Sequence, residues 1–352
     1  MKTSLNFALI LLTILLSTTA VADTGISDDD ITAFSAIYEE ELGELIVCTG
    51  YGFALVSDEI RVCSKKLKNE GNAPFIAPVK QAKGILVLYH GLSDSPFFMR
   101  SIAEHANSLG YSVIVPLTPG HGKLEADADM QDPNLQARWY EHVDQVMALA
   151  KNDNLPLFIG GFSTGGAFAT WYTVQHPDEI DGLVLFSGAL QLTGGAESMS
   201  KIWGMKTLAK WLDGTYETQG PNPYKYPSVA SYSGLVLMDV IKDIRNYLKE
   251  NTVQQSIFAA HSLADRVTKF EGIEKTAASI KGEHTIFKVD ESYDLCHADL
   301  VINPIQIVQM EFDKAQVNVN ERCAVPKANP LHAQMLDTFA HYLATQTELA
   351  KK

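Results

Sequence analysis

Buried-strand patterns alternate with amphipathic patterns over most of the chain beyond residue 83. Short, fully apolar runs predict strands at 84–89, 111–115, 157–160, 182–186, 256–260 and 285–289. Apolar residues at helical spacing predict helices at 97–109, 135–151, 167–175 and 331–349, the first of them capped by Ser95. This alternation predicts an α/β fold with a mostly parallel sheet and helices on both faces.

Between residues 190 and 252 the alternation stops. Helical patterns at 201–212 and 232–248 flank a connection rich in Pro and Tyr. We interpret this segment as a helical cap inserted into the sheet domain. This segment has more apolar bulk than one packed helix needs, with Trp203, Trp211, Ile202, Met205 and Leu208, so we expect part of it to line an acyl pocket. The alternative is that both tryptophans only form the core of the cap.

The first 22 residues have the layout of a signal peptide. Lys2 precedes an apolar core at 7–16, and the small-residue pattern Ala20-Val21-Ala22 ends the segment. The core is too short to cross a membrane, and signal peptidase accepts this small-residue pattern. We therefore expect cleavage near Ala22 and an exported protein, periplasmic or secreted. A buried N-terminal helix is the alternative.

After this leader, a helix is predicted at 31–42 and a disulfide-closed β-hairpin at 44–65, followed by a connection at 71–81. The predicted organisation is a signal peptide (1–22), an N-terminal extension with the hairpin (23–82), a first part of the core (83–189), the cap (190–252) and a second part of the core (253–352).

The chain is acidic, with 28 Lys and Arg against 42 Asp and Glu and a net charge of −14. Lys2 is the only charged residue of the leader, so its removal leaves one positive charge fewer and a net charge of about −15. Such a surface repels nucleic acid and anionic lipid. We expect no nucleic-acid partner and no stable membrane anchor.

Four cysteines remain after the leader: Cys48, Cys63, Cys296 and Cys323. An even number in an exported chain predicts two disulfides, with three possible pairings. Proximity in the sequence favours Cys48–Cys63 and Cys296–Cys323. The alternatives are a free thiol at Cys296 or its pairing with Cys48 or Cys63. No C-x-x-C pair or nearby histidine spacing supports a zinc site, so no metal is expected.

The pentapeptide Gly161-Phe162-Ser163-Thr164-Gly165 is a G-x-S-x-G motif between a predicted strand and a predicted helix. In this setting the serine lies at the apex of a sharp turn with a strained backbone. The chain on either side of the turn comes so close that side chains would clash there, and glycine removes the clash. Ser163 is therefore the candidate nucleophile.

A serine nucleophile needs a base, and the base needs a carboxylate to orient it. Asp265 and His297 follow two later predicted strands, acid first, and are the candidates for these roles. The competing residues are Asp290, Asp294, Asp299, His261, His284, His332 and His341. The competing acids lie too near His297 in the sequence to reach its far nitrogen easily. The competing histidines lie at predicted strands or on the terminal helix.

The tetrahedral intermediate of acyl transfer needs N–H donors for its oxyanion. The candidates are Thr164, directly after the nucleophile, and Leu92, in the turn at 90–92 after the first predicted strand of the core. His121, in the turn at 119–122, is interpreted as a structural residue.

With these motifs the chain resembles the α/β-hydrolase family, and within it the branch of monoacylglycerol-lipase-like carboxylesterases and lysophospholipases. The resemblance rests on the turns at 90–92 and 119–122, the motif at 161–165, and the surroundings of Asp265 and His297. It implies metal-free hydrolysis of an acyl ester, with no cofactor and with a small-molecule ester or lipid-like substrate. The hairpin at 44–65 and the insertion around Cys323 depart from the family's pattern.

The leading prediction is an exported serine hydrolase that cleaves carboxylic esters of apolar acyl groups through an acyl-enzyme on Ser163. In this mechanism Asp265 orients His297, and the N–H groups of Leu92 and Thr164 hold the oxyanion. One alternative is a serine aminopeptidase-like hydrolase of the same fold, which needs an acidic site for the free amine of its substrate. Another is an inactive hydrolase fold that serves for binding.

Overall fold

The structure is a computed structural model, which describes residues 25–50, 58–202 and 204–351. The expected leader at 1–22, part of the expected hairpin (51–57) and Trp203 lie outside these residues. Within the described ranges, no helix has the length and apolar character needed to cross a membrane.

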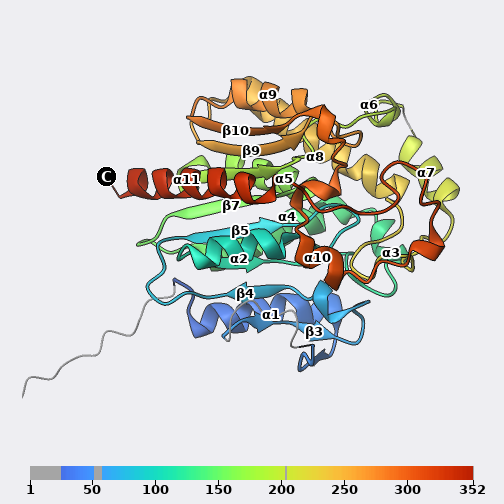
Figure 1. The fold of residues 1–352 in the computed structure, drawn as a ribbon, viewed down its shortest axis with the longest axis horizontal. Helices are drawn as coiled ribbons and strands as arrows, with labels where there is room; N and C mark the ends of the chain where they lie inside the picture. Colours follow the sequence, from blue (N-terminus) through green and yellow to red (C-terminus); the bar gives the residue numbers. More distant parts are fainter. Residues whose placement is uncertain (1–24, 51–57, 203, 352) are drawn as a thin grey trace, which may run out of the picture.

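An eight-stranded sheet forms the centre of the molecule, with strand order β10-β9-β8-β7-β5-β6-β4-β2 (Figure 1). From β10 to β6 all neighbours are parallel, whereas β4 is antiparallel to both β6 and β2. The strands are β2 (Ile60–Arg61), β4 (Phe75–Ala77), β5 (Ile85–Tyr89), β6 (Ser112–Val115), β7 (Leu157–Phe162), β8 (Gly182–Phe186), β9 (Ile257–Ser262) and β10 (His284–Val289). The predicted mostly parallel sheet is confirmed.

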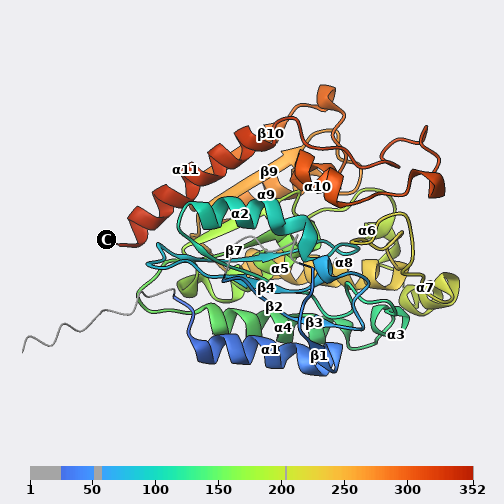
Figure 2. The same cartoon turned by 60° about the horizontal axis from the view of Figure 1, so that its bottom comes forward.

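Helices cover both faces of this sheet, as predicted (Figure 2). One face carries α2 (Arg100–Ser108) and α11 (His332–Ala350). The other carries α4 (Leu135–Ala150), α5 (Thr164–Gln175) and α8 (Ser231–Glu250), with α1 (Asp28–Leu42) packed on α4 and α9 (Phe270–Ser279) beside β9. The shorter helices are α3 (Asp127–Met130), α6 (Ala196–Met199), α7 (Met205–Asp213) and α10 (Pro304–Gln309). Single 3₁₀ turns lie at Glu70–Asn72, Pro96–Met99, Pro177–Glu179, Glu291–Tyr293, Ala298–Val301 and Lys314–Gln316.

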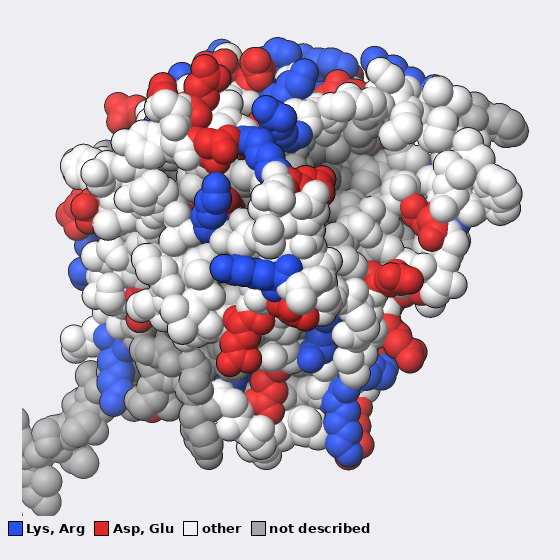
Figure 3. Space-filling view, turned by 45° about the vertical axis from the view of Figure 1, so that its right-hand side comes forward, with Lys and Arg blue, Asp and Glu red and all other residues white. Residues whose placement is uncertain are grey.

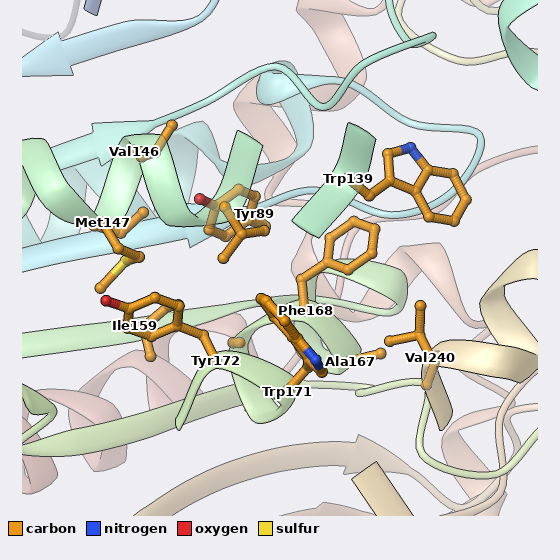
Figure 4. Packing of buried hydrophobic residues seen from close by; sticks show 14 of the residues in the cluster. Tyr89, Trp139, Val146, Met147, Ile159, Ala167, Phe168, Trp171, Tyr172 and Val240 are labelled. Carbon is orange, nitrogen blue, oxygen red and sulfur yellow. The ribbon is translucent and has the colours of Figure 1, made fainter. Parts of the chain in front are cut away.

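Burial on both faces explains why the core strands read as continuous apolar runs. Along β5, alternate side chains enter opposite cores: Val87 and Tyr89 face α4 and α5, and Leu88 faces α2 and α11. Figure 4 shows the first of these cores, where the rings of Trp139 and Phe168 pack with centroids 5.2 Å apart. This packing fixes the two helices against the strand that leads to Ser163.

The segment expected to be a cap divides into two parts. The long helix α8 packs against α4 and α5 and contributes Val240 to the core of Figure 4, so it belongs to the layer that covers the sheet. The short helices α6 and α7 lie outside this layer, at the right of Figure 1. The boundaries proposed at 190 and 252 stay predictions.

Two local expectations are wrong. Residues 71–81 were expected to be a connection, yet β4 forms there by pairing with β6. Ser95 does not cap the following helix, because its hydroxyl donates a hydrogen bond to the Tyr224 carbonyl, at 2.9 Å. Both differences come from partners that are distant in the sequence and that local patterns cannot reveal.

In the N-terminal extension, β1 (Leu45–Ile46) pairs antiparallel with β3 (Cys63–Ser64), and a disulfide joins Cys48 to Cys63. Between these two strands in the sequence lies β2, which pairs with β4, and β4 pairs with β6 of the core. The extension is therefore attached to the core by strand pairing as well as by the packing of α1.

Candidate active site

Ser163 lies at the turn between β7 and α5, with φ of 54° and ψ of −115°. This left-handed backbone is strained for serine. A Cβ atom at Gly161 would lie 2.4 Å from the Tyr89 carbonyl oxygen, and one at Gly165 would lie 2.1 Å from the same atom. The two flanking glycines are therefore required by close backbone approach, as the motif predicts.

The structure brings Ser163, His297 and Asp265 together at the carboxyl end of the parallel strands. His297 Nε2 lies 2.9 Å from Ser163 Oγ, and His297 Nδ1 lies 2.6 Å from Asp265 Oδ2. Asp265 follows β9 and His297 follows β10, so neighbouring parallel strands deliver them to one edge. The arrangement is that of a nucleophile, a base and an orienting acid.

Asp265 is completely buried and fully engaged. Its Oδ1 accepts hydrogen bonds from the amides of Val267 (2.7 Å) and Thr268 (3.1 Å), and its Oδ2 accepts one from Thr268 Oγ1 (2.9 Å). Burial alone would raise the pKa of Asp265, but the charge and hydrogen bond of His297 and the Val267 amide hold this pKa well below its ordinary value. The ionised acid makes His297 Nδ1 the donor, which leaves Nε2 to accept the proton of Ser163.

The competing acids have other roles. Asp290 accepts a hydrogen bond from the Ser292 amide, and Asp294 pairs with Arg322. Asp299 accepts a hydrogen bond from the Lys327 amide. Within the described ranges, Asp265 is the carboxylate that contacts His297.

Among the competing histidines, His261 comes nearest to the site. It is completely buried in β9, and its Nε2 lies 3.9 Å from Asp265 Oδ2. Burial lowers the pKa of His261 to about 4, so its ring is neutral at physiological pH. Thr268, which holds both Asp265 oxygens, was missed from the sequence because a threonine three residues after an acid is no distinctive signal.

Leu92 and Thr164 both line the cavity at Ser163. Thr164 is the first residue of α5, where backbone amides lack partners within the helix. The amides of Leu92 and Thr164 donate to no acceptor among the residues that the structure describes. They are thus available to hold an oxyanion.

Two buried histidines support the turn that carries Leu92. His90 Nε2 accepts from the Thr118 amide at 3.1 Å, so its Nδ1 carries the proton and donates to the Gly91 carbonyl at 2.9 Å. His121 Nε2 lies 2.6 Å from the Leu92 carbonyl oxygen, and its Nδ1 lies 3.2 Å from the Thr118 carbonyl oxygen. Burial lowers the pKa of both rings. The two imidazoles thereby contact two successive carbonyls of this turn.

A cavity of about 590 Å³ opens at Ser163 under the cap. Figure 3 shows the cap side of the molecule, where the surface is hollowed between acidic and basic side chains. Most of the lining is apolar and comes from α6, α7, α8 and nearby loops, including Met199, Met205, Leu212, Leu235 and Leu237. Met205 lines the cavity, as expected for part of the cap, whereas Trp211 is 78% exposed on α7 and lies outside the lining.

A disulfide joins Cys296, directly before His297, to Cys323, with Cα atoms 5.8 Å apart. Arg322 adds a second tie from this insertion, because it donates to the carbonyl of Ala264 at 2.9 Å. The insertion is therefore fixed to the loops of both Asp265 and His297. Within the described ranges, no group of three or more His, Cys, Asp or Glu side chains is placed to hold a metal ion.

Comparison with known proteins adds to this geometry. Residues 80–233 match a family model described as serine aminopeptidase, S33. A thermostable monoacylglycerol lipase from Bacillus sp. (strain H-257) is 31% identical over 146 residues, which are 41% of this chain and 54% of that protein. The match thus spans about half the length of this curated relative.

Solved structures of similar fold include the monoacylglycerol lipase of Paleococcus ferrophilus, with a TM-score of 0.53, 17% identity, and coverage of 78% of this chain and 99% of that one. A highly thermostable carboxyl esterase from Bacillus coagulans has a TM-score of 0.55 and 13% identity, and covers 83% of this chain and 100% of that one. At these identities the likeness shows the fold. The fold is that of the α/β-hydrolases, and the sequence is similar over part of its length to the serine aminopeptidase S33 family model and to a monoacylglycerol lipase.

Proposed function

We propose that the protein is an exported serine hydrolase that cleaves carboxylic esters of apolar acyl groups through an acyl-enzyme on Ser163. One observation carries the proposal. His297 is hydrogen-bonded through one nitrogen to Ser163 and through the other to Asp265, at the end of a largely apolar cavity.

The mechanism follows from the atoms that face one another. Ser163 Oγ attacks the ester carbonyl carbon while its proton passes to His297 Nε2, and the ionised Asp265 stabilises the imidazolium. The amides of Leu92 and Thr164 stabilise the negative oxygen of the tetrahedral intermediate. His297 then gives its proton to the leaving alkoxide, and the acyl group stays on the serine. A water molecule, deprotonated by the same nitrogen, releases the acid.

The character of the cavity supports an apolar acyl group. Side chains of the cap and of α8 give it an apolar lining next to the nucleophile, and transfer of alkyl groups from water to such a site is favourable. Export is part of the proposal because the leader pattern at 1–22 and two disulfides occur in the same chain.

A serine aminopeptidase is the second candidate, because the matching family model carries that description. An aminopeptidase would need a carboxylate to bind the free amine of its substrate. Within the described lining of the cavity, Asp94 is the acid, and it is paired with Lys225. The remaining charge in this lining is the cation Arg266, which disfavours a protonated amine.

Turnover measurements test the choice. The purified protein is assayed with p-nitrophenyl esters of graded acyl length and with aminoacyl-p-nitroanilides, and Ser163→Ala serves as the background for both. We expect ester turnover that rises with acyl length from acetate and far exceeds turnover of the amides. Preferential cleavage of the aminoacyl substrates would show that the protein is an aminopeptidase and not an esterase. No turnover of either set above the background would support a binding function.

A further inference from the structure

A second cavity of about 580 Å³ adjoins the first, and the two share His297 as a wall. Its far side is formed by the insertion around Cys323, which departs from the family's pattern. Ser163 and Thr164 line the first cavity but not the second. The catalytic histidine of the proposed mechanism therefore separates two spaces of similar size.

In the proposed reaction the two cavities would bind different parts of the ester. The acyl group stays on Ser163, next to the apolar first cavity, whereas the leaving oxygen must face His297 Nε2 to take its proton. The rest of the alcohol then extends beyond His297, away from the acyl group. The second cavity is lined by His297 and by Ala298 but not by Ser163.

Positive charge lies at the junction of the two cavities, whereas the acids Asp299 and Glu321 line the second cavity alone. Arg266 and Lys225 line both of them. Lys225 is paired with the buried Asp94, and Arg322 of the second cavity is paired with Asp294. Arg266 is exposed and makes no ion pair within the described ranges, although its charge also acts on Asp294.

The backbone of Arg266 is held firmly at this junction. Its neighbour Asp265 is fixed by His297 and Thr268, and its other neighbour, Val267, accepts a hydrogen bond from the Thr193 amide at 2.9 Å. A guanidinium presented from such a loop recognises a carboxylate or a phosphate through paired N–H groups.

We infer that the second cavity receives the alcohol portion of the ester and that Arg266 selects alcohols that carry a carboxylate or a phosphate. This inference rests on the proposed esterase function. It assigns the acyl group and the alcohol to separate spaces and gives the insertion around Cys323 a role as the wall of the alcohol site. Arg266 is a specificity residue in this assignment and takes no part in the proton transfers.

Matched esters test the inference. They share one acyl group, and their alcohols are a neutral diol, a hydroxycarboxylate or a phosphate-bearing alcohol of equal length. For the wild type at low salt, we expect kcat/KM for at least one anionic ester to exceed that of the neutral ester by about tenfold, as one charge-assisted contact allows. The carboxylate and phosphate arms show which anion fits. Added salt should shrink the preference, since the site is open to solvent.

In Arg266→Gln we expect the anionic-to-neutral ratio of kcat/KM to fall about tenfold, mainly through KM. Lys281→Gln removes an exposed charge outside both cavities and should leave the ratio unchanged. An equal ratio in wild type and Arg266→Gln would overturn the inference while leaving the esterase proposal intact. Failure to hydrolyse any ester would overturn both.

A measurement on the wild type alone guards against a variant that does not fold. The free hydroxycarboxylate and phosphate-bearing alcohols should inhibit competitively at lower concentrations than the neutral diol. Equal inhibition by all three would contradict an anion site at Arg266.

Discussion

His297 Nε2 lies 2.9 Å from Ser163 Oγ although 134 positions of the sequence separate the two residues. The contact exists because β7 and β10 are parallel strands of one sheet, so the loops that follow them meet at the same edge. Burial of both faces of that sheet fixes the edge, and with it the geometry that a proton transfer needs.

Removal of the nucleophile or base should abolish most of the activity. Ser163→Ala and His297→Ala are each expected to lower kcat at least about a thousandfold, because the residues act as one unit. Asp265→Asn should be milder. The measurement is kcat on a p-nitrophenyl ester, with an unchanged far-ultraviolet circular dichroism spectrum as the check on folding. His341→Ala, an exposed change on α11, is the matched control and should keep full activity. Near-normal turnover by Ser163→Ala would refute the mechanism.

The apolar wall of the cavity predicts a dependence on acyl length. Met205 of α7 lines the cavity, so Met205→Ala should reduce kcat/KM for the longest esters by about tenfold relative to the shortest. Trp211 lies on the same helix with its side chain in solvent, and Trp211→Ala is therefore the control. A loss of the same size at every acyl length in Met205→Ala would mean that α7 only stabilises the fold.

The Cys296–Cys323 disulfide should support both activity and stability. It closes a loop across 27 positions, which in the chain-entropy description stabilises the folded state by about 3 kcal/mol. Cys323→Ser is expected to lower kcat and hasten thermal inactivation without a change in ester preference, because the bond holds the loop of His297. Cys48→Ser breaks the other disulfide, whose cysteines line neither cavity, and should affect thermal inactivation while kcat is kept. Peptide mapping without reduction checks the pairing directly, and unlinked Cys296 and Cys323 peptides would end this account.

Replacement of the buried acid Asp299 by asparagine should stabilise the folded protein in a pH-dependent way. Burial raises the pKa of Asp299 to about 6, despite the Lys327 and Cys296 amides that favour its ionised form, and its Oδ2 has no partner within the described ranges. The folded-state pKa lies above the unfolded-state value, so the stabilising effect of this proton is complete at acidic pH and is lost as pH rises through about 6. Asp299→Asn resembles the protonated acid and keeps an oxygen that can accept from Lys327.

The unfolding temperature of Asp299→Asn should therefore approach that of the wild type near pH 4 and exceed it above pH 6. The gain in free energy of unfolding should be at most about 3 kcal/mol. Asp290→Asn is the control, because hydrogen bonds to Ser292 lower the pKa of this exposed acid and reverse the expected trend. A wild type that is more stable than Asp299→Asn at pH 8 would show that the ionised acid is needed.

Much of this structure can be predicted from the sequence because the patterns that specify it are local. The fully apolar run of β8 was predicted with its observed limits, Gly182–Phe186, since a strand buried on both faces needs no partner to be recognised. The helix α1 begins at Asp28, three residues before the predicted start. Ser27 and Asp30 form a capping box there, a signal that was present in the sequence.

The remaining features depend on long-range contacts. β4 is three residues long and is defined by its pairing with β6 and β2. The position of Trp211 on the outer side of α7 follows from how that helix lies on α8. The order of Ser163, Asp265 and His297 along the chain suggested a shared site. Their distances, and the two cavities that meet at His297, required the packed fold.

Mapping a covalent adduct tests the central proposal most directly. The protein is treated with a fluorophosphonate, digested, and analysed by tandem mass spectrometry, in parallel with Ser163→Ala. The account predicts one modified serine, Ser163, with loss of ester turnover in proportion to labelling and no adduct in Ser163→Ala. Full ester turnover after complete labelling of Ser163, or an active protein labelled at another serine, would contradict it.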